Sequence, residues 1–278
     1  MTYNDIWRRL AMIHGESEAK AITRILLEDL FDFSLADIVC GAVEALSAAD
    51  ALHLEKAICR IEDYEPIQYV TGKAYFHGYT FHVEPGVLIP RPETEQLCDE
   101  VVSAMRELEH PSILDIGTGS GCISITIAKN LPRSMVSAWD ISGKALHIAS
   151  SNANSLSANV DFQKQDALNL PFHVGKWDAI VSNPPYICHK EINHMEKNVL
   201  NYEPHIALFV PNHDPLRFYK AIVKYSYTAL KPNGQLFFEI NPVYSNDIRN
   251  MLLDFGYKDI TITKDVFGKE RNATCRKR

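Results

Sequence analysis

Residues 183–186, Asn-Pro-Pro-Tyr, have the groups needed to hold a planar NH2 substituent. The side-chain oxygen of Asn183 and the backbone carbonyl of Pro184 can accept both N–H protons of such a group. An amide or aromatic amine is a poor nucleophile because its lone pair is delocalised, and two acceptors return electron density to the nitrogen. Tyr186 can stack on the planar group, while Pro184 and Pro185 stiffen the backbone before the substrate arrives. The catalytic candidates are Asn183, Pro184 and Tyr186, and the substrate-binding candidates are Asn183, Pro184, Pro185 and Tyr186.

A glycine-rich segment at residues 117–121, Gly-Thr-Gly-Ser-Gly, follows a short apolar run and forms a second candidate site. Glycines at a turn from strand to helix let the backbone approach a ligand closely, and the first turn of a helix offers unpaired amides. The third glycine of a dinucleotide-binding G-x-G-x-x-G motif would fall at Cys122, so the spacing here is G-x-G-x-G. The cofactor-binding candidates in this segment are Gly117, Thr118, Gly119, Ser120 and Gly121.

Further cofactor-binding candidates follow the next apolar runs. Asp140 lies about 20 residues beyond the glycines, where a carboxylate can accept hydrogen bonds from both ribose hydroxyls of a nucleoside. The G-x-G-x-G segment resembles motif I of the S-adenosylmethionine-dependent methyltransferases. This resemblance implies that Asp166 and Ala167, after the third expected strand, flank the adenine of the cofactor. Asn183 is the last candidate for contact with the cofactor. The glycines and Asp140 by themselves do not distinguish S-adenosylmethionine from NAD.

These segments belong to an alternating series of apolar runs and helical patterns that starts after Pro111. The expected strands are residues 112–116, 135–139, 159–163, 177–182, 234–240 and 259–263, and the expected helices are residues 123–131 and 143–155. The alternation predicts an α/β fold with a doubly wound, mostly parallel sheet covered by helices on both faces. Ligands of such sheets bind at the carboxyl ends of the strands, where all the candidates lie.

The chain before the sheet has a different pattern. Residues 1–66 indicate short helices, and Ser34 and Ser47 each precede an aspartate by three residues, as in a helix N-terminal cap. Residues 67–92 alternate in hydrophobicity around Gly78, which predicts a β-hairpin that continues into a proline-stiffened connector. The predicted parts are a small N-terminal helical domain (1–66), a β-hairpin connector (67–92) and the α/β domain (93–278).

Composition limits the classes of partner. Lysine and arginine number 28 against 35 aspartates and glutamates, a net charge of −7, so we expect no direct binding to nucleic acid. No run of about 18 apolar residues predicts a membrane span. Asp5, Arg8 and Arg9 interrupt the apolar residues at the start of the chain, unlike a signal peptide. We therefore expect a cytoplasmic protein with no membrane partner.

The cysteines and histidines indicate no metal. The six cysteines contain no C-x-x-C pair, and we expect them to be free and buried. His77 and His82 lie in the alternating run and are expected in strands. The charged residues 276–278 at the end of the chain are expected to form a solvated tail.

Several segments together resemble the HemK/PrmC family of release factor glutamine methyltransferases. These segments are residues 65–72 (Glu-Pro-Ile-Gln-Tyr-Val-Thr-Gly), 89–95 (Ile-Pro-Arg-Pro-Glu-Thr-Glu), 183–186 and 202–204 (Tyr-Glu-Pro), together with Ala207, Leu208, Asp265, Gly268 and Arg271. The resemblance extends from about Trp7 to Arg271. It implies that residues 93–278 form a class I S-adenosylmethionine-dependent methyltransferase domain and that residues 1–66 dock the substrate.

The same resemblance implies the reaction and the partners. The cofactor would be S-adenosyl-L-methionine. The methyl group would pass to the side-chain amide nitrogen, N5, of the glutamine in the Gly-Gly-Gln motif of class 1 peptide chain release factors. The release factor would be the protein partner, and we expect the enzyme to be a monomer.

Three alternatives stay open. A glutamine methyltransferase of a large-subunit ribosomal protein would share the chemistry, although we expect a different sequence at residues 89–95. An adenine-N6 methyltransferase of DNA or RNA would share the glycine segment, Asp140 and residues 183–186, but the net charge of −7 disfavours it. A non-catalytic module that docks on translation factors would have no need of an intact Asn183.

Four positions need structural explanation. Ala167 stands where the family often has a bulky residue, and Asn241 where it often has glycine. Asparagine adopts left-handed backbone conformations more readily than most residues, so we expect the chain to keep a left-handed turn at Asn241. Arg91 and Glu95 are either residues of the catalytic site or parts of a salt-bridged hinge between domains.

Overall fold

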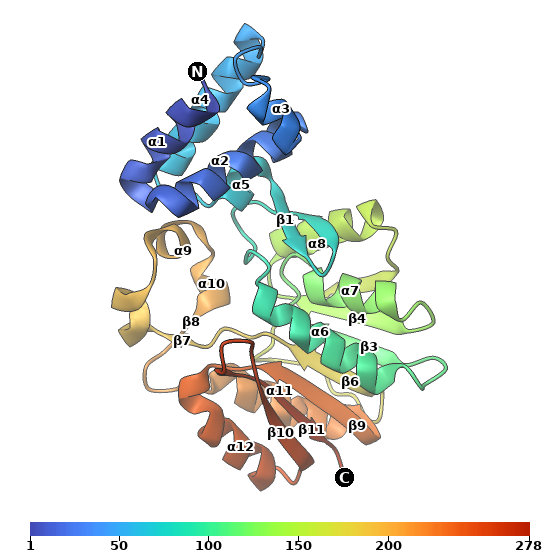
Figure 1. The fold of residues 1–278 in the computed structure, drawn as a ribbon. Helices are drawn as coiled ribbons and strands as arrows, with labels where there is room; N and C mark the ends of the chain where they lie inside the picture. Colours follow the sequence, from blue (N-terminus) through green and yellow to red (C-terminus); the bar gives the residue numbers. More distant parts are fainter. The chain divides into compact units, whose positions relative to one another are not determined.

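A computed structural model describes residues 1–278, except for the side chain of His194 (Figure 1). The chain divides into two compact units, each with its own buried core. The helical unit comprises Met1–Lys73, Val83–Pro85 and Met195–Tyr202. The sheet unit comprises Ala74–His82, Gly86–His194 and Glu203–Arg278. The three-part division at residues 66 and 92 stays a prediction.

The helical unit is built from helices that, except for the short α9 (Lys197–Tyr202), each bury an apolar face. Its other helices are α1 (Tyr3–His14), α2 (Glu16–Phe31), α3 (Leu35–Val39), α4 (Ala48–Glu62) and α5 (Ile67–Thr71). The predicted caps are confirmed, because the hydroxyl of Ser34 accepts a hydrogen bond from the Asp37 amide (3.2 Å) and that of Ser47 from the Asp50 amide (3.1 Å). The core between the helices includes Ile6, Leu10, Leu26, Leu27, Leu54 and Ile58.

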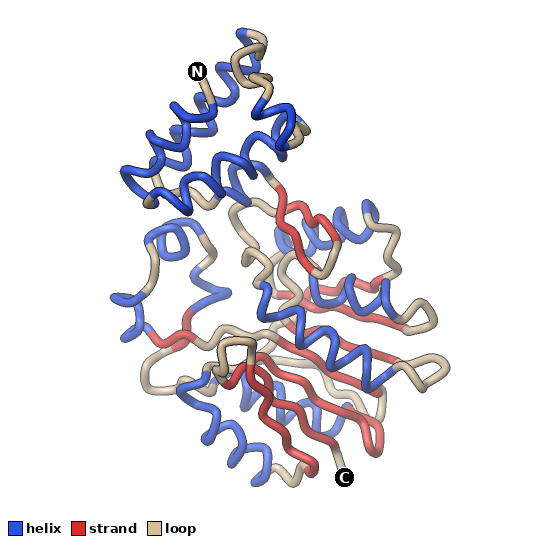
Figure 2. Tube along the Cα trace, viewed as in Figure 1, coloured by secondary structure: helices blue, strands red, loops and turns tan.

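The sheet unit contains a seven-stranded sheet in the order β10-β11-β9-β6-β3-β4-β5. Figure 2 draws the strands in red. Its strands are β3 (Ser112–Ile116), β4 (Met135–Asp140), β5 (Val160–Lys164), β6 (Trp177–Ser182), β9 (Leu230–Glu239), β10 (Lys258–Lys264) and β11 (Glu270–Arg276). The pairs from β9 to β5 are parallel, and β11 is antiparallel to both β9 and β10. The predicted doubly wound, mostly parallel sheet is therefore confirmed.

Successive residues of the central strands point into two separate cores, one on each face of the sheet. Ile113 of β3 and Val181 of β6 pack with α6 (Pro92–Met105) and α7 (Cys122–Asn130). Leu114 and Ile180 point the other way, into the core formed with α11 (Arg217–Ala229) and α12 (Ser245–Asp254). The central strands are continuously apolar because both of their faces are buried.

Apart from α8 (Gly143–Ser155), the remaining elements of the sheet unit are short. They are the hairpin of β1 (Lys73–Phe76) and β2 (Tyr79–His82), β7 (Ile187–Cys188), η1 (His189–His194), α10 (His205–Leu208), β8 (Phe209–Val210) and η2 (Pro242–Tyr244). The predicted hairpin is confirmed, with Gly78 at φ 76° in its turn. His77 lies in that turn at φ 50°, so its predicted place in a strand is wrong, whereas His82 does end β2.

Residues 276–278 were predicted as a solvated tail, and this is wrong for Arg276 and Lys277, whereas Arg278 is exposed. Arg276 pairs with Gln235 as the last residue of β11. The Lys277 backbone amide donates to the Gly234 carbonyl (2.8 Å), and its ammonium group donates to the Leu230 carbonyl (2.6 Å). The sequence pattern did not reveal β11 because much of this strand is polar.

Two further expectations need comment. Cys98, Cys188 and Cys275 are buried, Cys122 is partly exposed, and Cys40 and Cys59 are exposed, so the prediction of buried thiols fails for the last two residues. Among the residues that the structure describes, no three histidine, cysteine or acidic side chains form a group able to hold a metal ion, and the absence of a metal stays a prediction. Over the same residues, no helix is both long and apolar enough to cross a membrane.

Candidate active site

The glycine-rich segment connects the end of β3 to the start of α7. Gly117, Gly119 and Gly121 have φ values of 81°, 55° and 84°, a region that favours glycine. A Cβ atom on Gly121 would lie 2.8 Å from Cδ1 of Ile125 and 3.1 Å from Cβ of Ala149, so this glycine permits close packing of the helices. Gly117 and Gly119 instead face open space, so a ligand can approach their backbone closely. Their amides are not unpaired as expected, because that of Gly117 donates to the Trp139 carbonyl at 2.8 Å and that of Gly119 donates to Asp140.

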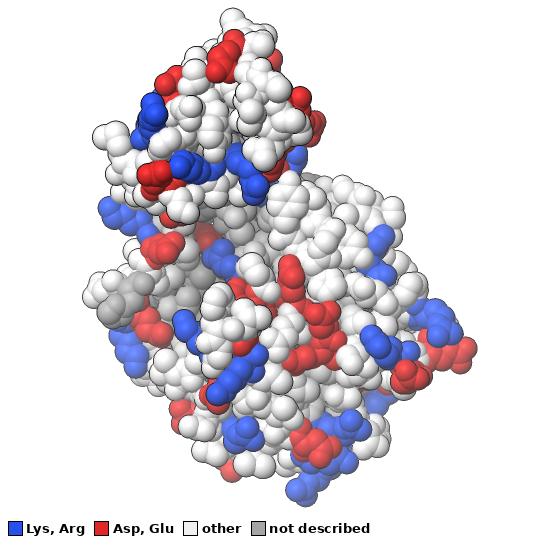
Figure 3. All heavy atoms as spheres, viewed as in Figure 1, with Lys and Arg blue, Asp and Glu red and all other residues white. Residues whose placement is uncertain are grey.

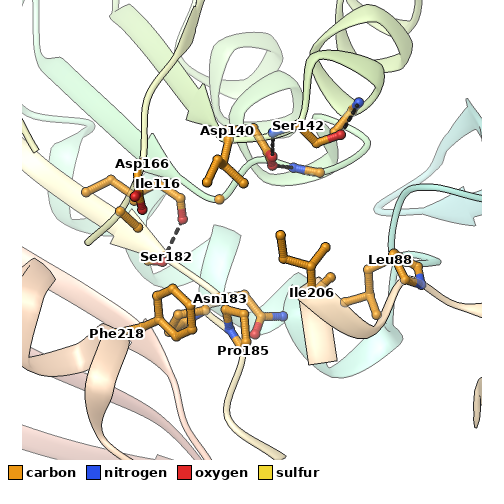
Figure 4. Close-up of a pocket in the computed structure, with 18 of the residues that line it drawn as sticks. Leu88, Ile116, Asp140, Ser142, Asp166, Ser182, Asn183, Pro185, Ile206 and Phe218 are labelled. Atoms are coloured by element: carbon orange, nitrogen blue, oxygen red, sulfur yellow. Dashed lines mark hydrogen bonds between the residues drawn. The ribbon is translucent and has the colours of Figure 1, made fainter. Parts of the chain in front are cut away.

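A cavity of about 370 Å³ lies at the carboxyl ends of β3, β4 and β6 (Figure 4). The structure brings eight of the predicted site residues together in its lining, namely Gly117, Gly119, Asp140, Asp166, Ala167, Asn183, Pro184 and Pro185. Thr118 and Ser120 are instead buried within the loop, and Tyr186 lies outside the lining. A cavity of this size is in the range that holds small-molecule ligands.

Asp140 lies at the end of β4 with part of its hydrogen-bonding capacity in use. Its Oδ2 accepts from the Gly119 amide at 2.9 Å, and its Oδ1 accepts from the Ser142 amide at 2.8 Å (Figure 4). A carboxylate has about four acceptor sites, so two remain for a ligand. Burial raises the pKa of Asp140, and these backbone hydrogen bonds act in the opposite direction. Asp140 thus both fixes the glycine loop and faces the cavity.

Asn183 follows β6 and lines the cavity opposite Asp140 in the view of Figure 4. The end of β6 is tied to β3 because the Ser182 hydroxyl donates to the Ile116 carbonyl at 2.6 Å. The side-chain amide nitrogen of Asn183 lies 3.5 Å from Oγ1 of Thr94, a residue in the first turn of α6. Two prolines follow Asn183 and stiffen the backbone after it. The backbone of Asn183 is therefore restrained by Ser182 on one side and by the prolines on the other.

Comparison with known proteins places this site in a family. A model of the PrmC N-terminal domain matches residues 7–72, and a model of the methyltransferase small domain matches residues 79–201. The release factor glutamine methyltransferase of Bacteroides thetaiotaomicron is 45% identical over 97% of this chain and 97% of its own length. The chain belongs to the release factor glutamine methyltransferase family. The protein of the same name from Flavobacterium psychrophilum is 39% identical and covers 94% of this chain and 93% of its own.

Solved structures support the fold of this methyltransferase. The crystal structure of ribosomal protein L11 methylase from Lactobacillus delbrueckii subsp. bulgaricus matches with a TM-score of 0.50 at 21% identity, over 70% of this chain and 84% of that chain. A methyltransferase from Pyrococcus furiosus also gives a TM-score of 0.50, at 17% identity, over 72% of this chain and 90% of its own. The predicted class I methyltransferase fold is thus confirmed.

Tyr186 of this methyltransferase has a hydrogen-bond partner that the sequence did not indicate. Its hydroxyl donates to Oε1 of Glu239 at 3.0 Å, and its ring packs partly against the core on the α11 side of the sheet. Burial is the main cause that raises the pKa of Tyr186 above its ordinary value, and Glu239 adds to it. Stacking of Tyr186 on a substrate stays a prediction.

Glu239, the last residue of β9, connects several parts of the site. It is only 2% exposed, and its Oε2 accepts from the Thr94 hydroxyl at 2.6 Å. Burial raises the pKa of Glu239, while the hydrogen bonds from Thr94 and Tyr186 and the charge of Arg271 lower it. Neither Thr94 nor Glu239 was predicted as a site residue, because their contact joins residues 145 positions apart in the chain.

The two departures from the family pattern have structural explanations. Asn241 has φ −74°, so the expected left-handed turn is absent at this residue. Its side-chain nitrogen instead donates to the Tyr186 carbonyl at 3.2 Å, which holds the segment after residues 183–185. Ala167 leaves little bulk in the cavity wall, but Leu168 and Phe218 line the same cavity. Phe218 comes from α11 and was not predicted.

Arg91 and Glu95 hold segments of the sheet unit. Arg91 forms an ion pair with Glu203, whose side chain is 1% exposed and also accepts from the Ile89 amide at 3.2 Å. Both partners of this ion pair belong to the sheet unit. Glu95 accepts a hydrogen bond from the His77 amide at 2.7 Å, which connects α6 to the hairpin turn. The contacts therefore support a positioning role for both side chains.

Proposed function

We propose that this methyltransferase transfers the methyl group of S-adenosyl-L-methionine to N5 of the glutamine in the Gly-Gly-Gln motif of class 1 peptide chain release factors. The observation that carries the proposal is the convergence of Gly119, Asp140, Asn183 and Pro184 on one cavity. Relatives at 45% and 39% identity are named release factor glutamine methyltransferases, and they match almost the whole chain.

The residues of the cavity fit S-adenosyl-L-methionine. The open backbone at Gly117 and Gly119 would hold the amino-acid end, and the two remaining acceptor sites of Asp140 would bind the ribose hydroxyls. Leu168 and Phe218 would pack against the adenine. When bound, S-adenosyl-L-methionine supplies an electrophilic methyl group on its sulfonium.

Asn183 and Pro184 would prepare the glutamine amide for the reaction. The Asn183 side-chain oxygen and the Pro184 carbonyl would each accept one N–H proton, which directs the nitrogen lone pair into the cavity. The rigid Pro184-Pro185 backbone sets this geometry in advance, so that little orientation entropy is lost at the moment of reaction. Tyr186 would stack on the planar amide.

The partners of the reaction follow from the family and from charge. The PrmC N-terminal domain match over residues 7–72 supports the helical unit as the docking part for a release factor. On the face of the sheet unit drawn in Figure 3, lysine and arginine side chains are interspersed with aspartate and glutamate. Together with the net charge of −7, this supports a protein substrate over nucleic acid. We infer a cytoplasmic location, because the proposed substrates are release factors, and we propose that the protein is a monomer.

A competition experiment tests the substrate. The pure protein would be incubated with S-adenosyl-L-methionine and a mixture of whole release factor, ribosomal proteins and DNA, and mass spectrometry would locate any added methyl group. We expect one methyl group, on the Gly-Gly-Gln glutamine. A methyl group on adenine or on a ribosomal protein would overturn the proposed substrate, and cofactor binding without any transfer would favour the non-catalytic docking module.

A variant of Asn183 serves as the control for that experiment. Asn183→Ala should slow transfer by about 10²-fold or more, the size of effect produced by removal of one hydrogen-bonding group from a transition state. The dissociation constant of the cofactor should change little. A small effect on turnover would remove Asn183 from the role assigned to it.

A further inference from the structure

The Thr94 hydroxyl lies between a buried carboxylate and the amide of Asn183. Thr94 is 2% exposed, and its Oγ1 is 2.6 Å from Oε2 of Glu239 and 3.5 Å from Nδ2 of Asn183. The first distance is that of a strong O–H···O hydrogen bond, and the second is long. Hydrogen bonds of catalytic groups are often long in a site without substrate and shorten when it binds.

The chemistry of the three groups fixes the direction of both contacts. Burial disfavours the ionised form of Glu239, whereas the hydrogen bonds from Thr94 and Tyr186 and the charge of Arg271 favour it. An ionised carboxylate only accepts hydrogen bonds, so with Glu239 ionised the single hydroxyl proton of Thr94 is donated to it. The Thr94 oxygen can then only accept from Asn183, which requires the NH2 end of that amide to face Thr94. Because the oxygen and nitrogen of an amide point in different directions from the same carbon, Oδ1 of Asn183 is turned away from Thr94.

Glu239 is itself held in place. Its second oxygen, Oε1, accepts from the Tyr186 hydroxyl at 3.0 Å, and its backbone carbonyl accepts from the Tyr219 hydroxyl at 3.0 Å. It ends a strand that is paired on both sides, by β6 and β11. Arg271 on β11 contributes a positive charge to its surroundings. The carboxylate therefore has a fixed position from which to orient Thr94.

We propose that Glu239 and Thr94 are positioning residues that select one of the two orientations of the Asn183 amide. In the selected orientation, Oδ1 of Asn183 is presented to an N–H of the substrate amide. In the reversed orientation, the NH2 group of Asn183 would face the substrate NH2, two donors would meet, and the substrate nitrogen would not be activated. The kinetic consequence rests on the proposed function, whereas the orientation of Asn183 is a property of the protein without substrate.

The first test removes the hydroxyl of Thr94 without changing its volume. Thr94→Val should lower kcat for methyl transfer by about 10- to 100-fold, the range seen when an outer partner that orients a functional ligand is lost. The cofactor dissociation constant should not change, and Thr94→Ser, which keeps the hydroxyl, should restore most of kcat. Equal activity of Thr94→Val and wild type would overturn the proposal.

A matched control separates this effect from general damage to the core. Thr126 in α7 is also buried, and its hydroxyl has no hydrogen-bond partner among the described residues. Thr126→Val makes the same chemical change and should leave kcat unchanged. An equal loss of kcat in both variants would overturn the positioning role of Thr94.

A double-mutant cycle tests whether Thr94 acts through Asn183. If it does, Thr94→Val should cause little further loss of kcat in an Asn183→Ala background, because the oriented group is already absent. If the fold-loss of kcat in the double variant equals the product of the losses in the two single variants, the two residues act independently. This result would overturn the proposal.

The last test requires no methyl acceptor. In protein labelled with 15N-asparagine, the side-chain NH2 signal of Asn183 can be assigned by its loss in Asn183→Ala. Thr94→Val should shift this signal and speed its exchange with solvent, whereas Thr126→Val should not. An unchanged Asn183 signal in Thr94→Val would overturn the positioning role. If wild type fails to methylate a release factor, the proposed function fails, and this measurement still decides the orientation of Asn183.

Discussion

At the scale of single residues, the polar side chains of the site differ in the hydrogen-bonding capacity that their neighbours leave them. Asp140 donates nothing and accepts from the amides of Gly119 and Ser142, with two acceptor sites remaining. Asp115 is fully buried in β3, where Oδ2 accepts from the Thr118 hydroxyl at 2.6 Å. Its Oδ1 has no hydrogen-bond partner among the described residues. Asp140 is therefore suited to bind a ligand, whereas Asp115 makes the free energy of unfolding depend on pH.

Replacement of Asp140 tests its role in ribose binding. Asp140→Ala should weaken the binding of S-adenosyl-L-methionine by about 10- to 100-fold, because hydrogen bonds to a charged group contribute about 1.5–3 kcal/mol. Titration calorimetry would measure the dissociation constant. Asp161→Ala removes an equal charge from an exposed position on the neighbouring strand β5 and should have no such effect. Unchanged affinity in Asp140→Ala would show that the assigned role is wrong.

Asp115 gives a prediction about pH and stability. Burial raises its pKa to about 7, against the opposing hydrogen bonds of Thr118 and Ser124. The pKa in the unfolded chain is about 3.9, so folding favours the protonated form. Protonation of Asp115 therefore increases the free energy of unfolding. This contribution has its full size below about pH 4 and disappears as the pH rises to about 7.

The variant Asp115→Asn removes this dependence because its side chain stays neutral. Its free energy of unfolding, relative to wild type, should therefore increase by about 2 kcal/mol between pH 5 and pH 8. Urea unfolding at the two pH values would measure the difference. The exposed Asp161→Asn serves as the comparison, and an equal pH dependence of both variants would contradict the prediction.

At the scale of elements, helix starts determine where several side chains lie. Thr94 is in the first turn of α6, which begins at Pro92 after the extended segment that contains Arg91. The proline supplies a φ angle suited to the first helical position. The Arg91–Glu203 ion pair then holds the segment that leads into the helix. Both features bring the Thr94 hydroxyl to the end of β9.

The cap of α4 provides a test at this scale. Ser47→Ala removes the acceptor of the Asp50 amide and should lower the free energy of unfolding by about 1 kcal/mol. Ser47→Thr keeps both the capping oxygen and the hydroxyl that donates to Oδ2 of Asp50 at 2.7 Å, and should be close to wild type. Urea unfolding gives the free energy, and hydrogen exchange of the α4 amides shows whether the loss is in that helix. Equal stability of the alanine and threonine variants would contradict the assigned cap.

At the scale of the whole molecule, the helical unit and the sheet unit each have a core of their own. Leu26 is fully buried in the helical unit, and Leu114 is fully buried in the sheet unit. All residues that line the cavity belong to the sheet unit. Stability and cofactor binding can therefore be altered separately.

Truncation of the two leucines tests this separation. Leu26→Ala should destabilise the helical unit by about 2–5 kcal/mol and leave the cofactor dissociation constant unchanged. Leu114→Ala should speed hydrogen exchange in β3 and β4 instead. Exchange resolved by peptide mass spectrometry would show where each loss occurs. Faster exchange in β3 after Leu26→Ala would contradict the separation of the two cores.

The cavity brings together residues that the sequence placed only at strand ends. Gly119, Asp140 and Asn183 were predicted from their positions after apolar runs, and all three line the cavity. Tyr186 was predicted from the same motif, yet its hydroxyl points to Glu239. A motif shows which residues follow a strand, but the neighbouring strands decide where each side chain points.

The sequence by itself determined the elements whose causes are local. The bounds of β3, β6 and α8 agree with those expected, because apolar runs and helical periodicity depend on near neighbours in the chain. The caps at Ser34 and Ser47 were predicted for the same reason. Only the tertiary structure decided the partners of Glu239, the pairing of the polar strand β11 and the burial of Asp115. These depend on strand order and on contacts between residues far apart in the chain, which local patterns do not encode.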